Sequence, residues 1–381
     1  MVEWKKLVSV ADVLYGYPFE SSFFSEDSDN IPLIRIRDVK PAIASTYFSG
    51  NYSEDYIIRK GDILVGMDGE FNLEKWNDRN GLLNQRVLKL SGREGLSIDG
   101  YLYHYMGPVF KNVEKQTPGG SVKHLSAKVI NSLIIPIPSL SDQERIAGIL
   151  DTFTSAIDNL KAQIAQRRKQ YEFYRDQLLD LEGKEGVEMK TLGEVCEIRG
   201  RIGFRGYTRD DQVEKGEGVI SLSPGNIDNG QMVYNGCTYI TWEKYEESPE
   251  IKTFNGDILF CKTGSTVGKV AMVKELPCEA TINPQLVVLK NITIDPQYLN
   301  YILGTYKIQT IVKRLAGIGS VPNISQEKLG NITIPVPSLQ EQHRIVAILD
   351  TFEASISNLE AQLKQRERQY EYYRNKLLTF D

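Results

Sequence analysis

The sequence predicts an α+β protein in which two domains of mixed helix and sheet are separated by an antiparallel coiled coil of two long, similar helices. Three observations lead to this class. A long helical segment occurs twice, starting at Leu150 and again at Leu349. Each copy follows a stretch of short apolar runs bounded by Gly, Asn and Pro, which favours strands in a compact domain. The two stretches resemble each other only weakly, so the chain is a tandem repeat with pseudo-two-fold symmetry.

The repeat is clearest in the helical segments. "LDTFTSAIDNLKAQIAQRRKQYEFYRDQLL" begins at Leu150, and "LDTFEASISNLEAQLKQRERQYEYYRNKLL" begins at Leu349. The similarity continues upstream through "IPIPSLSDQERIAGIL" and "IPVPSLQEQHRIVAIL", and more weakly through "RKGDILVGMDG" and "FNGDILFCKTG". The expected organisation is a first domain over 1–138, a helical spacer over 139–182, a linker over 183–188, a second domain over 189–337 and a second helical spacer over 338–381.

Single elements follow from local patterns. Short β-branched or apolar runs predict strands over 62–65, 86–90, 257–260 and 286–289. The alternate prolines before each helix exclude a helix there and require an extended lead-in segment. Ser141 with Glu144, and Ser338 with Glu341, match the Ser-x-x-Glu capping box that opens a helix.

Each long helix carries an apolar and aromatic stripe at the alternating three- and four-residue spacing of a coiled-coil seam. Because the second domain joins the end of one helix to the start of the other, and domain termini usually lie close together, the two helices are expected to pair antiparallel. An intermolecular coil in a homodimer is the alternative. A spacer of about 25 residues would span roughly 37 Å. The stripe contains Ile157, Leu160, Ile164, Arg167, Tyr171, Tyr174 and Leu178 in the first copy, and Ile356, Leu359, Leu363, Arg366, Tyr370, Tyr373 and Leu377 in the second.

Composition narrows the function classes. The chain has 381 residues and a formal net charge of -5, with a pI near 5.6. This balance opposes a simple basic footprint for nucleic acid, although a basic concave surface can coexist with acidic outer faces. With no signal peptide and no membrane-spanning apolar run, a cytoplasmic protein without membrane contact is expected. The four cysteines lack metal-ligand spacing and are expected to be reduced thiols.

No catalytic motif is recognisable. "GSTVGKV" at Gly264 has only three residues between its glycines, and Val270 follows Lys269 where Ser or Thr would stand, so it fails the phosphate-loop pattern. No metal site is predicted either. The chain is expected to be a non-catalytic protein, although an enzyme with an unrecognised site remains an alternative.

The duplicated Pro-Ser-Leu-x-x-Gln-x-Arg-Ile segment followed by a Tyr-rich helix resembles the specificity subunit of type I restriction-modification systems, over essentially the full length. The resemblance implies two target-recognition domains, each reading one half of an asymmetric bipartite site in double-stranded DNA. It also implies that the helices bind two adenine-N6 methyltransferase subunits, with motor-nuclease subunits completing a restriction complex. S-adenosylmethionine, ATP and magnesium would belong to those partners. The competing interpretation is a two-domain adaptor that binds only polypeptides.

Candidate DNA contacts are polar or charged residues in turns and glycine-rich loops. The turn after the strand at 257–260 can hold phosphate, whereas the equivalent turn of the first domain carries acids that can accept a hydrogen bond from cytosine. For each residue, an ordinary surface or turn role is the alternative. The candidates are Arg35, Arg37, Asp68, Glu70, Arg86, Lys123, His124, Arg205, Asn226, Lys262, Thr263, Ser265, Thr266, Lys269, Gln285, Lys313, Arg314 and Asn323.

Overall fold

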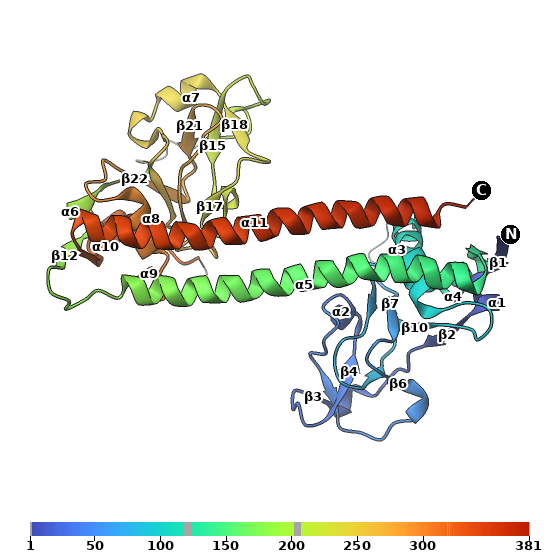
Figure 1. The fold of residues 1–381 in the computed structure, drawn as a ribbon. Helices are drawn as coiled ribbons and strands as arrows, with labels where there is room; N and C mark the ends of the chain where they lie inside the picture. Colours follow the sequence, from blue (N-terminus) through green and yellow to red (C-terminus); the bar gives the residue numbers. More distant parts are fainter. Residues whose placement is uncertain (1, 118–122, 202–206, 318, 320, 381) are drawn as a thin grey trace. The chain divides into compact units, whose positions relative to one another are not determined.

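The computed structural model describes residues 2–117, 123–201, 207–317, 319 and 321–380. The chain divides into two compact units, which are described separately (Figure 1). Unit 1 contains residues 1–161 and 361–381, and unit 2 contains residues 162–360. Across the described residues, every helix is too short or too polar to span a bilayer.

Unit 1 begins with the first domain. Its strands are β1 (Glu3–Lys6), β2 (Ala11–Tyr15), β3 (Phe24–Ser25), β4 (Ile31–Ile34), β5 (Tyr47–Phe48), β6 (Ile57–Ile58), β7 (Ile63–Gly66), β8 (Leu73–Lys75), β9 (Gly81–Leu83), β10 (Val87–Gly92) and β11 (Ile134–Ile137). Its helices are α1 (Leu7–Val10), α2 (Ile36–Val39), α3 (Asp99–Gln116), α4 (Ala127–Ser132) and the first part of α5 (Leu140–Leu179).

The strands of unit 1 form three sheets. One is antiparallel with the order β2-β10-β7-β8, another has the order β3-β5-β4-β9-β6 with a parallel β4–β9 pair, and β1 pairs with β11. Helix α3 packs on the first sheet through Tyr101, Leu102 and Phe110, which are fully buried. The same core takes in Leu150 of α5 and Tyr370 of the C-terminal helix, so the long helices close the core of the domain.

Unit 2 contains the second domain. Its strands are β12 (Glu188–Thr191), β13 (Glu197–Arg199), β14 (Gln212–Val213), β15 (Val219–Leu222), β16 (Ile227–Asp228), β17 (Gln231–Met232), β18 (Thr238–Ile240), β19 (Ile258–Cys261), β20 (Val270–Met272), β21 (Ala280–Ile282), β22 (Leu286–Lys290) and β23 (Thr333–Val336). Its helices are α6 (Leu192–Val195), α7 (Trp242–Glu246), α8 (Pro296–Leu303), α9 (Tyr306–Ala316), α10 (Gln326–Gly330) and part of α11 (Leu339–Leu378).

The sheets of unit 2 repeat those of unit 1. The order β13-β22-β19-β20 matches β2-β10-β7-β8, the parallel β15–β21 pair matches β4–β9, and β12–β23 matches β1–β11. The four strands predicted from sequence are present as β7, β10, β19 and β22, each shifted by at most two residues at an end. The units differ mainly in the second sheet, which has five strands in unit 1 and four in unit 2.

The first lead-in proline of each copy, Pro136 or Pro335, lies in the extended strand β11 or β23, and the second, Pro138 or Pro337, follows directly after that strand. In the described residues each strand pairs on one side. Helix α11 begins after Ser338, whose Oγ accepts the Glu341 amide at 3.3 Å, so Ser338 is confirmed as the cap, whereas the Glu341 side chain accepts from Arg344. The first capping prediction was wrong. Helix α5 is capped by Ser139, whose Oγ accepts the Asp142 amide at 3.2 Å, because the serine next to Pro138 ends the extended segment in both copies.

Both long helices have 40 residues, so the estimate of about 25 was too short, because the lead-in motif is itself helical. At 1.5 Å per residue each helix is about 60 Å long. In unit 2 they run antiparallel, since Arg168 pairs with Glu360 at 2.5 Å while Tyr171 donates to Glu353 at 3.1 Å (Figure 1).

The predicted stripe contains more than seam packing. Ile157, Ile164 and Ile356 are at least nine-tenths buried. The tyrosines at its far end make two repeated stacks, Tyr373 on Phe153 in unit 1 and Tyr174 on Phe352 in unit 2. Arg366 is exposed and donates to Gln369 at 3.0 Å, and Arg167 is half-buried. Half-buried positions of the stripe are Leu160, Leu178, Leu359, Leu363 and Leu377.

Candidate nucleic-acid interface

Three of the predicted contact residues of unit 1 lie together beside the ends of β7 and β10. One carboxylate oxygen of Asp68 lies 2.6 Å from Nδ1 of His124, and the other lies 3.4 Å from Nε of Arg86. The Arg86 side chain is 55% exposed, and its backbone has a φ of 70°. That left-handed conformation is uncommon outside glycine and often marks functional positions. We call Asp68, Arg86 and His124 the unit 1 trio.

The equivalent residues of unit 2 are also adjacent. The Thr263 hydroxyl donates to Oδ1 of Asn323 at 2.7 Å. Gln285 accepts a hydrogen bond from Asn283 at 3.2 Å, and its Nε2 lies 3.5 Å from the position that a Cβ on Gly264 would occupy. Thr263, Gln285 and Asn323 form the unit 2 trio.

The same backbone pattern builds both trios. In each unit the turn after β7 or β19 is held between two other segments. One segment is the turn before β10 or β22, which carries Arg86 or Gln285. The other is the loop before α4 or α10, and this loop carries His124 or Asn323. Isolated β-bridges join Asp68 to His124 and Thr263 to Asn323. The matching backbone hydrogen bonds are Met67 N to Arg86 O, Gly69 N to Lys123 O and Leu125 N to Met67 O in unit 1, and Lys262 N to Gln285 O, Gly264 N to Pro322 O and Ile324 N to Lys262 O in unit 2.

The sequence predicts contacts in the turns after β7 and β19 and, separately, in the loops before α4 and α10. The structure brings each turn into contact with its loop. Gly69 and Gly264 occupy the turns with φ of 71° and 95°, which glycine adopts without strain. The unit 1 trio joins a carboxylate, a guanidinium and an imidazole, whereas the unit 2 trio joins a hydroxyl and two amides. One backbone arrangement therefore presents two different chemistries.

The other candidates of unit 1 have neighbours of their own. Arg37 donates to Ser45 and Thr46 at 3.1 and 2.7 Å, although its side chain is 57% exposed. The Arg35 guanidinium lies over the Phe24 ring. Two more candidates follow. Glu70 pairs with Lys40 at 3.5 Å, and Lys123 donates to the Glu114 carbonyl at 2.7 Å.

In unit 2 two candidates bind other parts of the domain. Asn226 is 4% exposed, and its amide holds the loop by accepting from Ser223 and donating to Val233, so it is a structural residue. Lys269 is also engaged, since its Nζ donates to the Ile227 carbonyl at 3.0 Å. The remaining candidates near these elements are Lys262 and Thr266, which are half-buried, and Ser265, Lys313 and Arg314, which are exposed. Arg205 lies outside the described residues.

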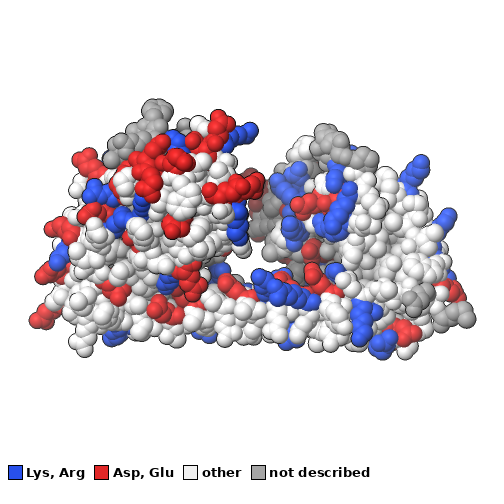
Figure 2. Space-filling model, turned by 90° about the horizontal axis from the view of Figure 1, so that it is seen from above, with Lys and Arg blue, Asp and Glu red and all other residues white. Residues whose placement is uncertain are grey.

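Acidic and basic side chains gather in different places on the face that Figure 2 draws. Asp and Glu gather over its left-hand part, where Figure 1 draws the sheets of unit 2, and Lys and Arg gather at one edge of its right-hand part.

A glutamine of the repeated motif fastens each long helix to its domain. In unit 1 the buried Gln143 accepts from the Ile98 amide at 3.1 Å and donates to the carbonyls of Leu96 and Pro138, both at 3.0 Å. Sequence reasoning used this glutamine only as a family signature. Its recurrence in both copies, where its neighbours vary, was the signal for a structural role.

In unit 2 the equivalent glutamine, Gln342, makes two matching contacts. Gln342 is 2% exposed, accepts from the Asp295 amide at 2.9 Å and donates to the Pro337 carbonyl at 2.8 Å. Each side-chain amide therefore satisfies a backbone amide of the domain and the carbonyl of the proline that follows the lead-in strand.

A second polar contact between each domain and the long helices lies about two helical turns after the glutamine. In unit 1 the ring of His104 bridges Asp151 of α5 and the Tyr370 hydroxyl of α11, at 3.1 and 3.0 Å. Burial lowers the pKa of His104, which favours a neutral ring that donates to Asp151 and accepts from Tyr370. Sequence reasoning did not single out His104.

Unit 2 places Tyr301 where unit 1 has His104. The Tyr301 hydroxyl donates to Asp350 at 2.5 Å, and its ring contacts Tyr171 edge-on. Asp350 and Tyr171 are the repeat partners of Asp151 and Tyr370. Glu353 adds a carboxylate that unit 1 lacks at this position, and it accepts from Tyr171 at 3.1 Å.

Glu353 is expected to make unit 2 less stable as the pH rises. Burial raises the pKa of its carboxyl above the ordinary value of 4.5, so the folded state binds its proton more tightly than the unfolded state. Its contribution is complete below the ordinary pKa and is lost as the pH rises through the raised value. Glu353→Gln should therefore stabilise unit 2 relative to wild type above that window, and should have little effect near pH 4.

Thermal unfolding of wild type and variant across pH 4 to 8 measures this difference. Glu172→Gln is the control, because it removes an exposed carboxylate from α5 in the same unit. A Glu353→Gln curve parallel to wild type over the whole range would contradict the expectation.

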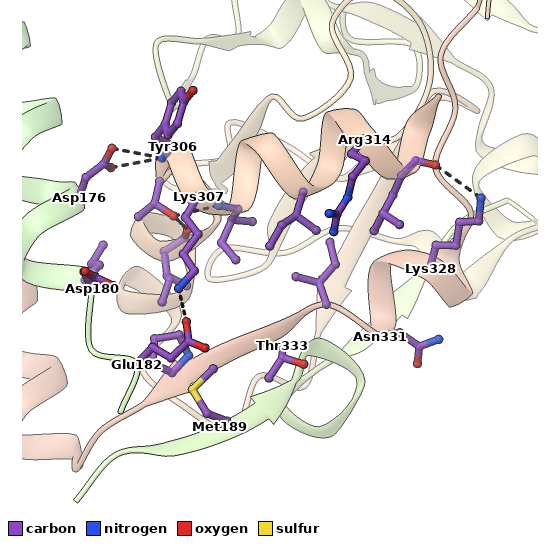
Figure 3. A pocket seen from close by; sticks show the side chains of 18 residues that line it. Asp176, Asp180, Glu182, Met189, Tyr306, Lys307, Arg314, Lys328, Asn331 and Thr333 are labelled. Carbon is purple, nitrogen blue, oxygen red and sulfur yellow. Dashed lines mark hydrogen bonds and ion pairs between the residues drawn. The ribbon is translucent and has the colours of Figure 1, made fainter. Parts of the chain in front are cut away.

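A cavity of about 1030 Å³ lies in unit 2 between the end of α5, helix α9 and strand β23. Its wall is mixed, with Leu179 and Ile308 among the apolar lining residues and Asp176 and Lys328 among the charged ones, and ion pairing between Lys307 and Glu182 spans one side (Figure 3). Of the sequence candidates, only Arg314 is among its described lining residues. The cavity is therefore separate from the unit 2 trio.

Comparison with known proteins places this architecture in one class. The family described as "Type I restriction modification DNA specificity domain" matches residues 1–167 and again 184–366. The two matches correspond to the two halves of the repeat. The chain therefore belongs to the family of type I restriction-modification DNA specificity subunits, which confirms the resemblance in its sequence.

Individual relatives agree. The chain is 28% identical to the type I restriction enzyme EcoBI specificity subunit of Escherichia coli, over 93% of this chain and 80% of that protein. It is 33% identical to the EcoR124I/EcoR124II specificity subunit of the same species, over 85% and 82%. The crystal structure of the type I S subunit from M. genitalium shares the fold, with a TM-score of 0.61, 17% identity, and coverage of 100% and 97%.

Proposed function

We propose that the chain reads an asymmetric, bipartite sequence in double-stranded DNA, with one half-site for each domain, on behalf of an adenine-N6 methyltransferase. The observation that carries this proposal is the pair of trios. A common backbone position that presents a charged set in one unit and a neutral amide set in the other suits the reading of two unlike half-sites. The domain limits proposed for this role are 1–138 and 189–337.

The long helices would bind the partner subunits. Their repeated sequence exposes an aromatic residue at the same position in each copy, Phe173 at 63% and Tyr372 at 60%. Exposed aromatic side chains are frequent anchors of protein interfaces. Two equal surfaces predict two methyltransferase subunits, and motor-nuclease subunits would join these to give a restriction complex.

The chain itself would contribute recognition and assembly without a catalytic step. S-adenosylmethionine would then be bound by the methyltransferase subunits, and ATP and magnesium by the motor-nuclease subunits. This division predicts that the purified chain alone neither methylates nor cleaves DNA, whereas a complex with its methyltransferase subunit methylates.

Exchanging one domain should change one half of the methylated motif. The chain is coexpressed with the methyltransferase subunit, and methylated adenines are mapped in the host DNA. Replacing residues 1–138 by the first domain of a relative should alter only one half-site, and replacing 189–337 should alter only the other. The two half-sites should respond separately because each trio belongs to a different unit.

A motif unchanged by both exchanges would overturn the proposal. The adaptor interpretation predicts a further result, no DNA footprint with or without the partner subunit. Exchange of an entire chain with its own helices serves as the control for assembly with the methyltransferase.

A further inference from the structure

We propose that Arg86 and Gln285 are matching base-reading residues, and that Arg86 recognises a guanine in one half-site and Gln285 an adenine in the other. The inference rests on the proposed function and gives it a chemical identity at one position of each half-site. Both residues stand in the same turn, between β9 and β10 in unit 1 and between β21 and β22 in unit 2.

The equivalence of the two positions follows from backbone contacts. The Arg86 carbonyl accepts the Met67 amide at 2.9 Å, and the Gln285 carbonyl accepts the Lys262 amide at 2.9 Å. Each contact attaches the turn to the residue that follows a central strand of the sheet. The two side chains therefore leave corresponding points of the fold.

Asp68 orients the Arg86 side chain. It faces Nε of Arg86 at 3.4 Å, which leaves the two terminal amino groups of the guanidinium for a ligand. Such a fork matches O6 and N7 of guanine in the major groove. His124 contacts the other oxygen of Asp68 at 2.6 Å, so Asp68 is a positioning residue in this proposal, and its acceptance of a hydrogen bond from cytosine stays a prediction.

Gln285 offers the complementary chemistry. A side-chain amide supplies one donor and one acceptor, which match N7 and N6 of adenine. Its Nε2 lies over the Gly264 turn, and its Oε1 accepts one hydrogen bond from Asn283 at 3.2 Å, which leaves a second lone pair on that oxygen. The neutral neighbours Thr263 and Asn323 contain no cation that would compete for the base.

Reciprocal substitutions test the assignment. Arg86→Gln and Gln285→Arg are each coexpressed with the methyltransferase subunit, and methylation is counted at every variant of the wild-type motif. Arg86→Gln should reduce the preference for guanine at one position of the unit 1 half-site by about tenfold to a hundredfold. Gln285→Arg should reduce the preference for adenine at one position of the other half-site and favour guanine there.

Other variants keep the test decisive if one substitution impairs folding. Arg86→Lys keeps the charge but removes the fork, so guanine preference should fall while methylation persists. Asp68→Asn should weaken the same preference by freeing the Arg86 side chain. Arg59→Gln removes an exposed cation of the same domain and should leave the motif intact.

Different outcomes would contradict the proposed function and the base assignment. A wild-type complex without a bipartite motif would contradict the proposed function itself. A normal wild-type motif that is unchanged in all four trio variants would overturn the base assignment alone. So would an equal loss of methylation at every sequence, because that result identifies Arg86 as a phosphate contact.

Discussion

Replacing Phe173 by Asp is expected to remove one of the two methyltransferase subunits from the complex. Phe173 is 63% exposed on α5 and makes an edge-on contact with Tyr174. A carboxylate placed in an apolar contact loses its hydration without gaining a partner. The affinity of that one site should therefore fall by about thirtyfold or more, since an interface anchor contributes about 2 kcal/mol or more.

Native mass spectrometry of the purified complex measures the loss as a change in subunit number. Tyr372→Asp should remove the other subunit, and the double variant should retain neither, because Tyr372 is the repeat partner of Phe173. Phe173→Tyr and Tyr372→Phe exchange the two natural side chains and should assemble normally. Full occupancy in Phe173→Asp, or loss of both subunits, would contradict two independent docking surfaces.

Gln342→Ala should destabilise unit 2 by about 2 to 6 kcal/mol. The substitution leaves the Asp295 amide and the Pro337 carbonyl without their partner in a buried joint, at a cost of about 1 to 3 kcal/mol for each unsatisfied group. Gln143→Ala should act in the same way on unit 1, through the Ile98 amide. Urea unfolding and amide exchange of the peptides that contain Asp295 and Ile98 measure the two effects.

The prediction is specific because faster amide exchange is expected only in the peptide that contains the lost hydrogen-bond partner. Gln340→Ala alters an exposed glutamine in the first turn of the same helix and should have little effect. If Gln342→Ala protected the Asp295 amide as well as wild type does, the glutamine would not be the fastening element.

Much of the fold could be predicted from sequence because the repeat is strong, and because local residues determine where its strands and helices begin and end. The lead-in prolines, the Ser338 cap and the alternating helix stripe each depend on neighbouring residues. The Ser139 cap was missed because a second serine two residues later also matched the pattern. The number of strands in each second sheet was beyond sequence reasoning, since short strands such as β14 depend on pairing with a strand far along the chain.

The site was predicted in part. Polar turn chemistry selected Asp68, Arg86 and His124 as separate candidates, and only the structure shows that they meet. Asn226 had the right chemistry and is buried, because burial and backbone partners cannot be read from residue type. His104 and Tyr301 were missed because unlike residues occupy one structural position.

The composition of the two units has a consequence for the order of folding during synthesis. Unit 2 is one continuous stretch, 162–360, so all of its core has been made once residue 360 is joined. The core of unit 1 includes contacts from Tyr370, Leu377 and Phe380, which are translated after all of unit 2. Unit 1 contains the domain that comes earlier in the sequence, yet its core can close only after unit 2 has been made.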